Sequence, residues 1–212
     1  MSEQTQDIKI ALSDEELWST FCEGEESAYT LLYYRHADRL YSYLKMLLSA
    51  SFHESIDDVF QETWVRVFQG REKFTSNGSG SFAGWLFRIA HNISVSLMRR
   101  PHTVSTFKDL ASEEIVLRTA SVSEYDPLSD NRSVDEVLKI LRGVVEELPM
   151  QYKEVYLLAE FEHLSIDQVA DATGISKGNA KVRLHRARQI VREKVLVALG
   201  VEFDGAKNNT EL

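Results

Sequence analysis

Apolar residues recur at intervals of three and four along most of this 212-residue chain, and hardly any stretch alternates between apolar and polar positions. The three-and-four spacing places apolar side chains on one face of an α-helix, whereas alternation would indicate a β-strand. Prolines, which interrupt helices, number only three in the whole chain. The pattern therefore predicts an all-α protein.

The helical pattern breaks down in the middle of the chain. Residues 101–133 are acidic, rich in hydroxyl side chains and weakly periodic, a composition typical of a linker. We therefore predict two small helical domains, over 14–100 and 134–200, joined by a flexible acidic linker at 101–133. Residues 201–212 are expected to form a frayed tail.

The clearest local signal lies in the second domain, where residues 164–195 read LSIDQVADATGISKGNAKVRLHRARQIVREKV. Ser165 and Gln168 have the spacing of a capping box that starts a short helix. Gly174 stands where a tight turn between helices needs a left-handed residue, and Ser176 can cap a second helix. That second helix would pack inward through Ala180, Leu184, Ala187 and Val191.

Two short helices joined by a glycine turn, the second of them basic, have the geometry that places a recognition helix in the major groove of DNA. Residues near the start of that helix would meet base edges, and arginines further along would meet phosphates. The alternative is a solvated basic helix in a bundle. The candidate DNA-contacting residues are Lys177, Asn179, Lys181, Arg183, His185, Arg186 and Arg188.

The net charge of −9 argues at first against a nucleic-acid partner, but the charge is sorted along the chain. Between residues 176 and 194 basic side chains outnumber acidic ones seven to one, and from 146 to 171 acidic side chains outnumber basic ones by the same ratio. A local basic surface is therefore compatible with an acidic chain. We expect the acidic stretches to weaken DNA binding by the free protein.

Residues 81–100, SFAGWLFRIAHNISVSLMRR, form the second signal. Polar and basic residues interrupt the apolar run, so it is not a membrane-spanning segment. Its apolar face is wider than a surface helix needs. The other face carries a candidate nucleic-acid-binding stripe of Arg88, Asn92, Ser96 and Arg99, with His91 and Arg100 beside it.

The loop before this helix, FTSNGSGSF at 74–82, has an aromatic residue at each end, Phe74 and Phe82. Aromatic rings beside basic residues hold unpaired or flipped bases in other proteins, although aromatic side chains at helical spacing usually belong to a core. Further upstream, SIDDVFQETWVRVFQGREKF at 55–74 presents a polar face that is either solvated or an acidic docking surface for a basic partner. That face consists of Asp57, Asp58, Gln61 and Glu62.

In this order, the three segments resemble bacterial RNA polymerase sigma factors of the extracytoplasmic-function group. The resemblance rests on DDVFQETWVRVF, on FAGWLFRIAHN followed by a pair of arginines, and on LPMQYKEVYLLAEFEHLSIDQVADATGISKGNAKVRLHRAR. It implies a sigma factor that binds core polymerase and directs promoter-specific initiation. The acidic face would dock on the clamp helices of the β′ subunit, and the second domain would also meet the β flap.

The resemblance also implies roles in DNA recognition. The aromatic loop would form a pocket for a flipped base of the minus-ten element, and Asn92 with the nearby arginines would hold the melted strand. The basic helix would read the minus-thirty-five element, and an anti-sigma factor is an implied partner. Relatives often carry an aspartate where this chain has Ser96, and G-T-V-K-S-R where it has residues 178–183, so the promoter sequence does not transfer.

Two other classes of function account for less of the sequence. A stand-alone helix-turn-helix regulator accounts for residues 164–195 but not for the acidic face or the aromatic loop. An enzyme is not expected, because the six histidines are scattered, and the chain has neither a cysteine cluster nor a nucleotide-binding glycine loop. We predict surface or helix-end positions for the histidines, no cofactor and no metal. The polar N-terminus and the single cysteine indicate a cytoplasmic protein without membrane insertion.

Overall fold

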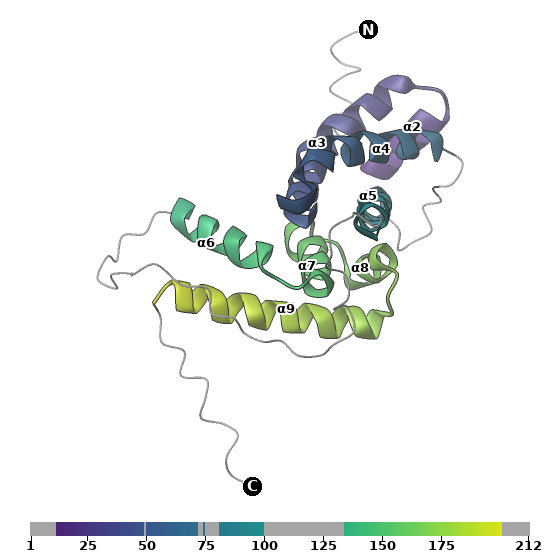
Figure 1. The fold of residues 1–212 in the computed structure, drawn as a ribbon. Coiled ribbons are helices and arrows are strands. Elements are labelled where there is room, and N and C mark those ends of the chain that lie inside the picture. Colours follow the sequence, from purple (N-terminus) through teal and green to yellow (C-terminus); the bar gives the residue numbers. More distant parts are fainter. Residues whose placement is uncertain (1–11, 49, 72–73, 75–80, 100–133, 201–212) are drawn as a thin grey trace.

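The structure is a computed structural model that describes residues 12–48, 50–71, 74, 81–99 and 134–200 (Figure 1). Every regular element within these ranges is helical, which confirms the all-α prediction. The predicted linker and tail lie outside the described residues. The N-terminal part contains the helices α2 (Asp14–Cys22), α3 (Glu26–Leu48), α4 (Ile56–Gln69) and α5 (Phe82–Arg99), with a 3-10 turn, η1 (Ala50–Ser55), between α3 and α4.

The C-terminal part contains the predicted helix-turn-helix. Its elements are α6 (Val134–Glu146), α7 (Met150–Tyr156), a π-helical turn η2 (Leu157–Phe161), α8 (Ile166–Thr173) and α9 (Lys177–Ala198). Ser165 and Gln168 form the expected capping box at the start of α8. Gly174 adopts the left-handed conformation with φ of +71°, and the Ser176 side chain accepts a hydrogen bond from the Asn179 amide.

The N-terminal core is built largely from aromatic rings. The ring of Trp18 on α2 lies with its centroid 5.9 Å from that of Phe74, 5.3 Å from Phe82 and 5.2 Å from Trp85. The Glu15 carboxylate accepts a hydrogen bond from the Phe82 amide at 3.0 Å, so α2 caps the first residue of α5. These contacts fix the start of α5 against α2.

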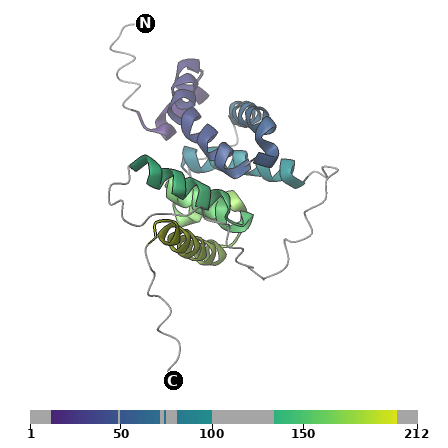
Figure 2. The same cartoon turned by 60° about the vertical axis from the view of Figure 1, so that its left-hand side comes forward.

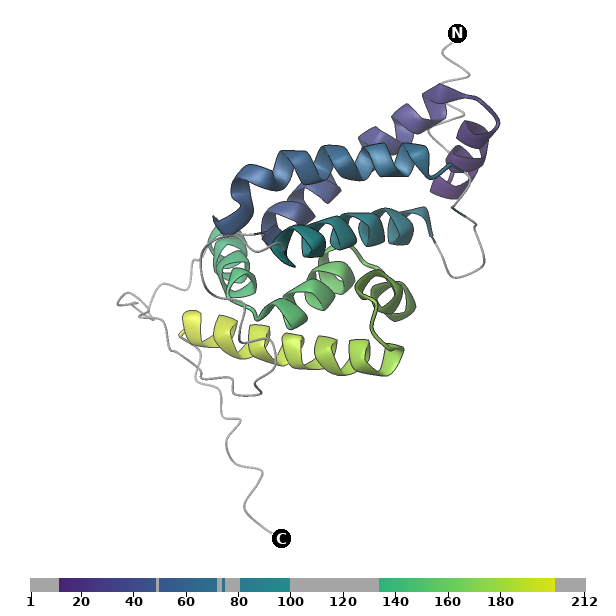
Figure 3. The same cartoon turned by 45° about the vertical axis from the view of Figure 1, so that its right-hand side comes forward.

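Helix α5 lies between the other N-terminal helices and the C-terminal helices α7 and α8 (Figures 1 and 3). A second view shows the same arrangement, with α9 on the far side of α7 and α8 (Figure 2). The predicted apolar face is buried at Phe82, Leu86 and Ala90. Phe87 and Ser94, on another side of the helix, are also buried, because α8 packs against α5.

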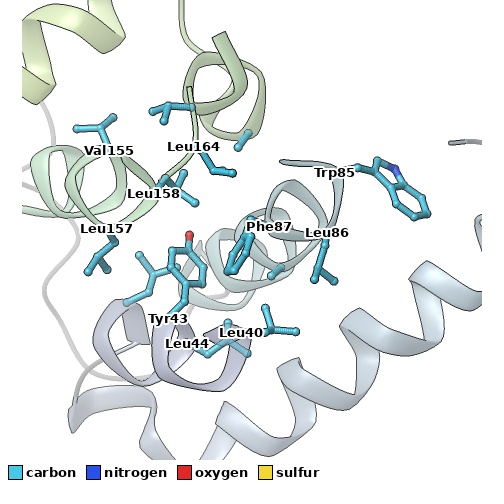
Figure 4. Close-up of a cluster of buried hydrophobic side chains, with 14 of the residues drawn as sticks. Leu40, Tyr43, Leu44, Trp85, Leu86, Phe87, Val155, Leu157, Leu158 and Leu164 are labelled. Carbon is cyan, nitrogen blue, oxygen red and sulfur yellow. The ribbon is translucent and has the colours of Figure 1, made fainter. Parts of the chain in front are cut away.

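Apolar side chains from both domains meet in one cluster (Figure 4). Tyr43 of α3 and Phe87 of α5 lie in edge contact, with ring centroids 5.3 Å apart. Leu157 and Leu158 approach them from η2 (Figure 4), and all four residues are buried. The two domains therefore share a continuous hydrophobic core in this conformation.

Of the five histidines that the structure describes, His36 and His91 are buried, contrary to the surface or helix-end positions predicted for all six. His36 Nε2 lies 2.6 Å from an oxygen of Asp14, which ties α3 to the start of α2. His91 Nε2 lies 3.0 Å from an oxygen of Glu154, between α5 and α7. Helical spacing alone could not distinguish these positions, because the face that each histidine occupies is covered by a different element.

A second polar contact across the domain boundary joins Arg39 of α3 to Glu162. Arg39 Nη2 donates a hydrogen bond to the Glu162 main-chain oxygen at 3.0 Å and lies 3.1 Å from the carboxylate Oε2. Since the hydrogen bond goes to the main chain, the buried Oε2 has no hydrogen-bond partner. Burial raises the pKa of Glu162 from 4.5 to about 7, against the opposing effect of Arg39.

We predict that Glu162 makes stability fall as pH rises. A carboxyl group with a raised pKa binds more protons in the folded than in the unfolded protein, so its contribution is complete below about pH 4.5 and is lost as pH rises through about 7. The slope in this window should approach at most about 1.4 kcal/mol per pH unit. Urea unfolding between pH 5 and 8 should show this slope in the wild type and a smaller one in Glu162→Gln. Equal slopes in the two proteins would contradict the assignment.

Candidate nucleic-acid interface

Helix α5 carries the predicted polar stripe on an exposed face. Arg88, Asn92 and Arg99 are all exposed, and so is Ser96 between them. Residues four apart on a helix lie one above another, so the stripe is continuous along the helix. Arg100 lies outside the described residues. The face can present two guanidinium groups and an amide to a nucleic-acid strand.

The two aromatic residues that bound the loop before α5 differ in exposure. Phe74 is half-buried, and its ring lies 5.2 Å from Trp85 and 6.1 Å from Phe82. Phe82 is fully buried, and a buried ring cannot stack on a base in this conformation. The expectation that Phe82 lines a base pocket is therefore corrected: it supports Phe74 from beneath. Residues 75–80 of the loop lie outside the described residues.

The acidic face of α4 is exposed along its length. Asp57, Asp58, Gln61 and Glu62 all reach solvent. The Tyr41 hydroxyl donates a hydrogen bond to Asp57 at 3.0 Å, and Glu62 pairs with Arg66 at 2.7 Å, one turn along the same helix. Such an exposed ion pair contributes about 0–1 kcal/mol, so Glu62 is easily transferred to another cation.

The recognition helix α9 exposes most of its predicted DNA-contacting residues. Ala180, Leu184, Ala187 and Val191 face inward as predicted. Lys181, His185 and Arg188 line one side of a groove of about 400 Å³ whose other side includes Ala159, Leu164 and Ile166. Arg186 is also exposed, and its guanidinium lies 3.5 Å from the Tyr152 hydroxyl. The basic stripe is therefore accessible to a duplex.

Acidic residues of the preceding segment pair with the basic residues of α9. Lys177 lies 2.7 Å from Asp167, and Arg188 lies 2.6 Å from Glu160. Lys194 lies 2.7 Å from Glu147 in the same way. The two oppositely charged stretches seen in the sequence thus meet in the fold. DNA phosphates must displace these carboxylates before the lysine and arginine side chains of α9 can contact DNA.

Arg183 has a different environment from its neighbours. Its Nη1 lies 3.0 Å from Glu154 Oε1, and its Nε donates to the Asn179 side chain at 3.1 Å. The Arg183 side chain is 23% exposed and that of Glu154 is 12% exposed. This pair joins α9 to α7 within one domain. In this conformation Arg183 therefore maintains the fold of the helix-turn-helix, and Asn179 orients Arg183.

Sequence reasoning missed the residues that join the two domains. These are Arg39, Ser81, Glu154, Glu162 and Gln168, together with the buried position of His91. One signal was available, because the apolar face of residues 81–100 is wider than a helix covered on one side requires. No pattern in the sequence identifies which element supplies the second cover.

Comparison with known families identifies both halves of the chain. The family model for sigma-70 region 2 matches residues 32–102, and the model for sigma-70 region 4 matches residues 138–191. The first match covers the acidic face of α4 and the polar stripe of α5, and the second covers the helix-turn-helix. The relatives that match along the chain are named as extracytoplasmic-function RNA polymerase sigma factors. The chain belongs to the extracytoplasmic-function group of sigma factors.

Two relatives illustrate the similarity. The sigma factor SigE of Mycolicibacterium smegmatis is 29% identical over 75% of this chain, and the match spans 58% of that relative's length. The sigma-E factor of Haemophilus influenzae is 27% identical over 87% of this chain and 96% of its own. The similarity to the second relative thus includes both regions and the segment between them.

Solved structures show the same fold. The Bartonella quintana sigma factor RpoE, in complex with the anti-sigma factor NepR, superposes with a TM-score of 0.58 at 20% identity, over 80% of this chain and 97% of that one. CnrH, in complex with the cytosolic domain of CnrY, gives a TM-score of 0.57 at 20% identity, over 85% and 95%. Within the described residues, no helix is long and apolar enough to cross a membrane, and no three metal-ligating side chains are grouped.

We predict that Arg183 and Lys181 of this sigma factor respond differently to substitution. Arg183→Ala leaves the Glu154 carboxylate mostly buried without its guanidinium partner, so the free energy of unfolding should fall by about 1–3 kcal/mol. Lys181→Ala, an exposed change on the same helix, should alter it by less than about 0.5 kcal/mol. Urea unfolding of the two variants measures the difference. Equal stability of the two variants would contradict the structural role of Arg183, which would then again be a candidate DNA-contacting residue.

Proposed function

We propose that this sigma factor binds core RNA polymerase through the acidic face of α4 and directs promoter-specific transcription initiation. The stripe on α5 would hold the melted minus-ten element, and the basic face of α9 would read the minus-thirty-five element. The observation that carries the proposal is that all three faces are exposed and lie on three separate helices. Each of the three surfaces is therefore open to a partner of its own.

The length of the chain between the two regions fits this proposal. The names of the promoter elements place them about 25 base pairs apart, or about 85 Å at about 3.4 Å per base pair. Residues 100–133 separate α5 from α6, and 34 residues can extend to about 110 Å. The segment is long enough for regions 2 and 4 to occupy both elements of one promoter. In the closed arrangement, α8 packs against α5, so regions 2 and 4 lie too close together to occupy both promoter elements.

Further partners follow from the same assignment. Region 4 would also dock on the β flap of the polymerase, since α6 exposes Val134, Val137 and Leu138. The structural neighbours were solved as complexes with an anti-sigma factor or with the cytosolic domain of another protein. An anti-sigma factor for this chain would act by covering one of the three exposed faces.

In vitro transcription with purified core polymerase tests the proposal directly. Run-off products from the organism's own promoter fragments should appear only when this protein is added. A helix-turn-helix regulator would instead bind a duplex site alone and give no products with core polymerase. That result would overturn the proposal and leave the exposed acidic face of α4 without a role.

Removing the acidic face should separate the protein from core polymerase. Asp58→Ala with Glu62→Ala deletes two exposed carboxylates of α4 and should weaken core binding at least about tenfold, equivalent to about 1.4 kcal/mol. Glu23→Ala with Glu26→Ala is the matched control, because it removes two exposed carboxylates of the same domain near the start of α3. Pull-down of core polymerase measures both. Equal losses in the two double variants would contradict docking through α4.

Asn92 should matter more for opening duplex DNA than for polymerase binding. Asn92→Ala should lower run-off from a duplex promoter about tenfold, because contacts to an unpaired base are worth about 1–3 kcal/mol. Retention on core polymerase should stay unchanged. Ser19→Ala, an exposed change on α2, provides the control. Full run-off by the Asn92 variant would remove Asn92 from the proposed site.

A further inference from the structure

We propose that the contact between the starts of α5 and α8 is a latch, which holds the free sigma factor in the closed conformation and limits its binding to core polymerase. This inference rests on the proposed function. The closed protein cannot place regions 2 and 4 on promoter elements about 85 Å apart, so the latch must open before both are read. Core polymerase would bind the open form and thereby shift the population toward it.

A chain of hydrogen bonds connects the caps of the two helices. The Ser81 hydroxyl caps α5 by accepting a hydrogen bond from the Gly84 amide at 3.1 Å, and it also accepts one from Gln168 Nε2 at 2.6 Å. The other side-chain atom of that amide, Gln168 Oε1, accepts a hydrogen bond from the Ser165 amide at 2.7 Å. The capping box of α8 is therefore bonded directly to the cap of α5, and closure stabilises the ends of both helices.

Gly84 permits this close approach. A Cβ atom at position 84 would lie 3.2 Å from Gln168 Cγ, which is tighter than ordinary van der Waals contact, and 3.4 Å from Gln168 Nε2. Glycine within a helix costs about 0.5–1 kcal/mol relative to alanine. At Gly84 the missing side chain makes room for Gln168. The latch thus depends on a residue that is unfavourable for α5 itself.

The chemistry of the interface suits a contact that opens. His91, Glu154 and Glu162 have side chains only 5%, 12% and 5% exposed, and all three lie where the domains meet. Opening returns these ionisable groups to water, which recovers part of the hydration lost on burial. The apolar contacts around Phe87 oppose opening. An interface that mixes both kinds of contact resembles transient interfaces between domains more than a permanent core.

The first test compares two glycine substitutions. Gly84→Gln places a side chain against Gln168, whereas Gly143→Gln adds the same side chain on α6, where a Cβ meets nothing within 4 Å. Gly84→Gln should increase the radius of gyration in small-angle X-ray scattering and tighten core polymerase binding at least about threefold, because the open form becomes more populated. Gly143→Gln should match the wild type. An expanded Gly84 variant with unchanged affinity would overturn the proposal.

The second test locks the latch covalently. Gly84→Cys with Gln168→Cys, in a Cys22→Ser background, brings two Cβ atoms close to the roughly 3.5–4.5 Å that a disulfide needs. The oxidised protein should not support transcription by core polymerase, and reduction should restore it. Equal activity in both states, or failure of the disulfide to form, overturns the latch. Failure of both the reduced variant and the wild type to transcribe counts instead against the proposed function.

Discussion

The burial of α5 on two sides is the constraint on which the rest of the closed structure depends. On one side, α5 completes the aromatic core around Trp18 and Phe82. On another, where Phe87 and Ser94 are buried, α8 packs against the helix. Only the stripe through Arg88 and Asn92 remains in solvent. The helix that carries the candidate strand-binding residues is thus also the structural link between the domains, so a change in domain packing must alter its environment.

The sequence predicted the features whose causes are local. The capping box at Ser165, the left-handed Gly174 and the inward face of α9 all follow from backbone geometry and helical period, and the structure confirms each. The burial of His91 and Glu162 depends on a second domain separated by a long segment of chain. Nothing in the spacing of α5 names its partner. The extra width of its apolar face indicated a second cover without identifying it.

Charge sorting along the chain has a structural counterpart in region 4. The carboxylates of Asp167 and Glu160 pair with basic side chains of α9. The positive charge of the basic face is therefore partly neutralised before any DNA phosphate binds. Exposed ion pairs of this kind are weak and are screened by salt. They can therefore lower the affinity of the free protein for DNA, and the basic side chains of α9 can still exchange their carboxylate partners for DNA phosphates. An acidic chain with a net charge of −9 can still present a DNA-binding helix.

Glu154 shows why domain packing and the helix-turn-helix are not independent. One of its oxygens binds Arg183 of α9 and the other binds His91 of α5. The first contact lies within region 4 and can persist when the domains separate, whereas the second exists only in the closed form. Losing His91 leaves the carboxylate with Arg183 and access to water, which is a smaller disturbance than losing the guanidinium. Because Glu154 keeps its cation in either state, region 4 can leave α5 with its recognition helix already formed.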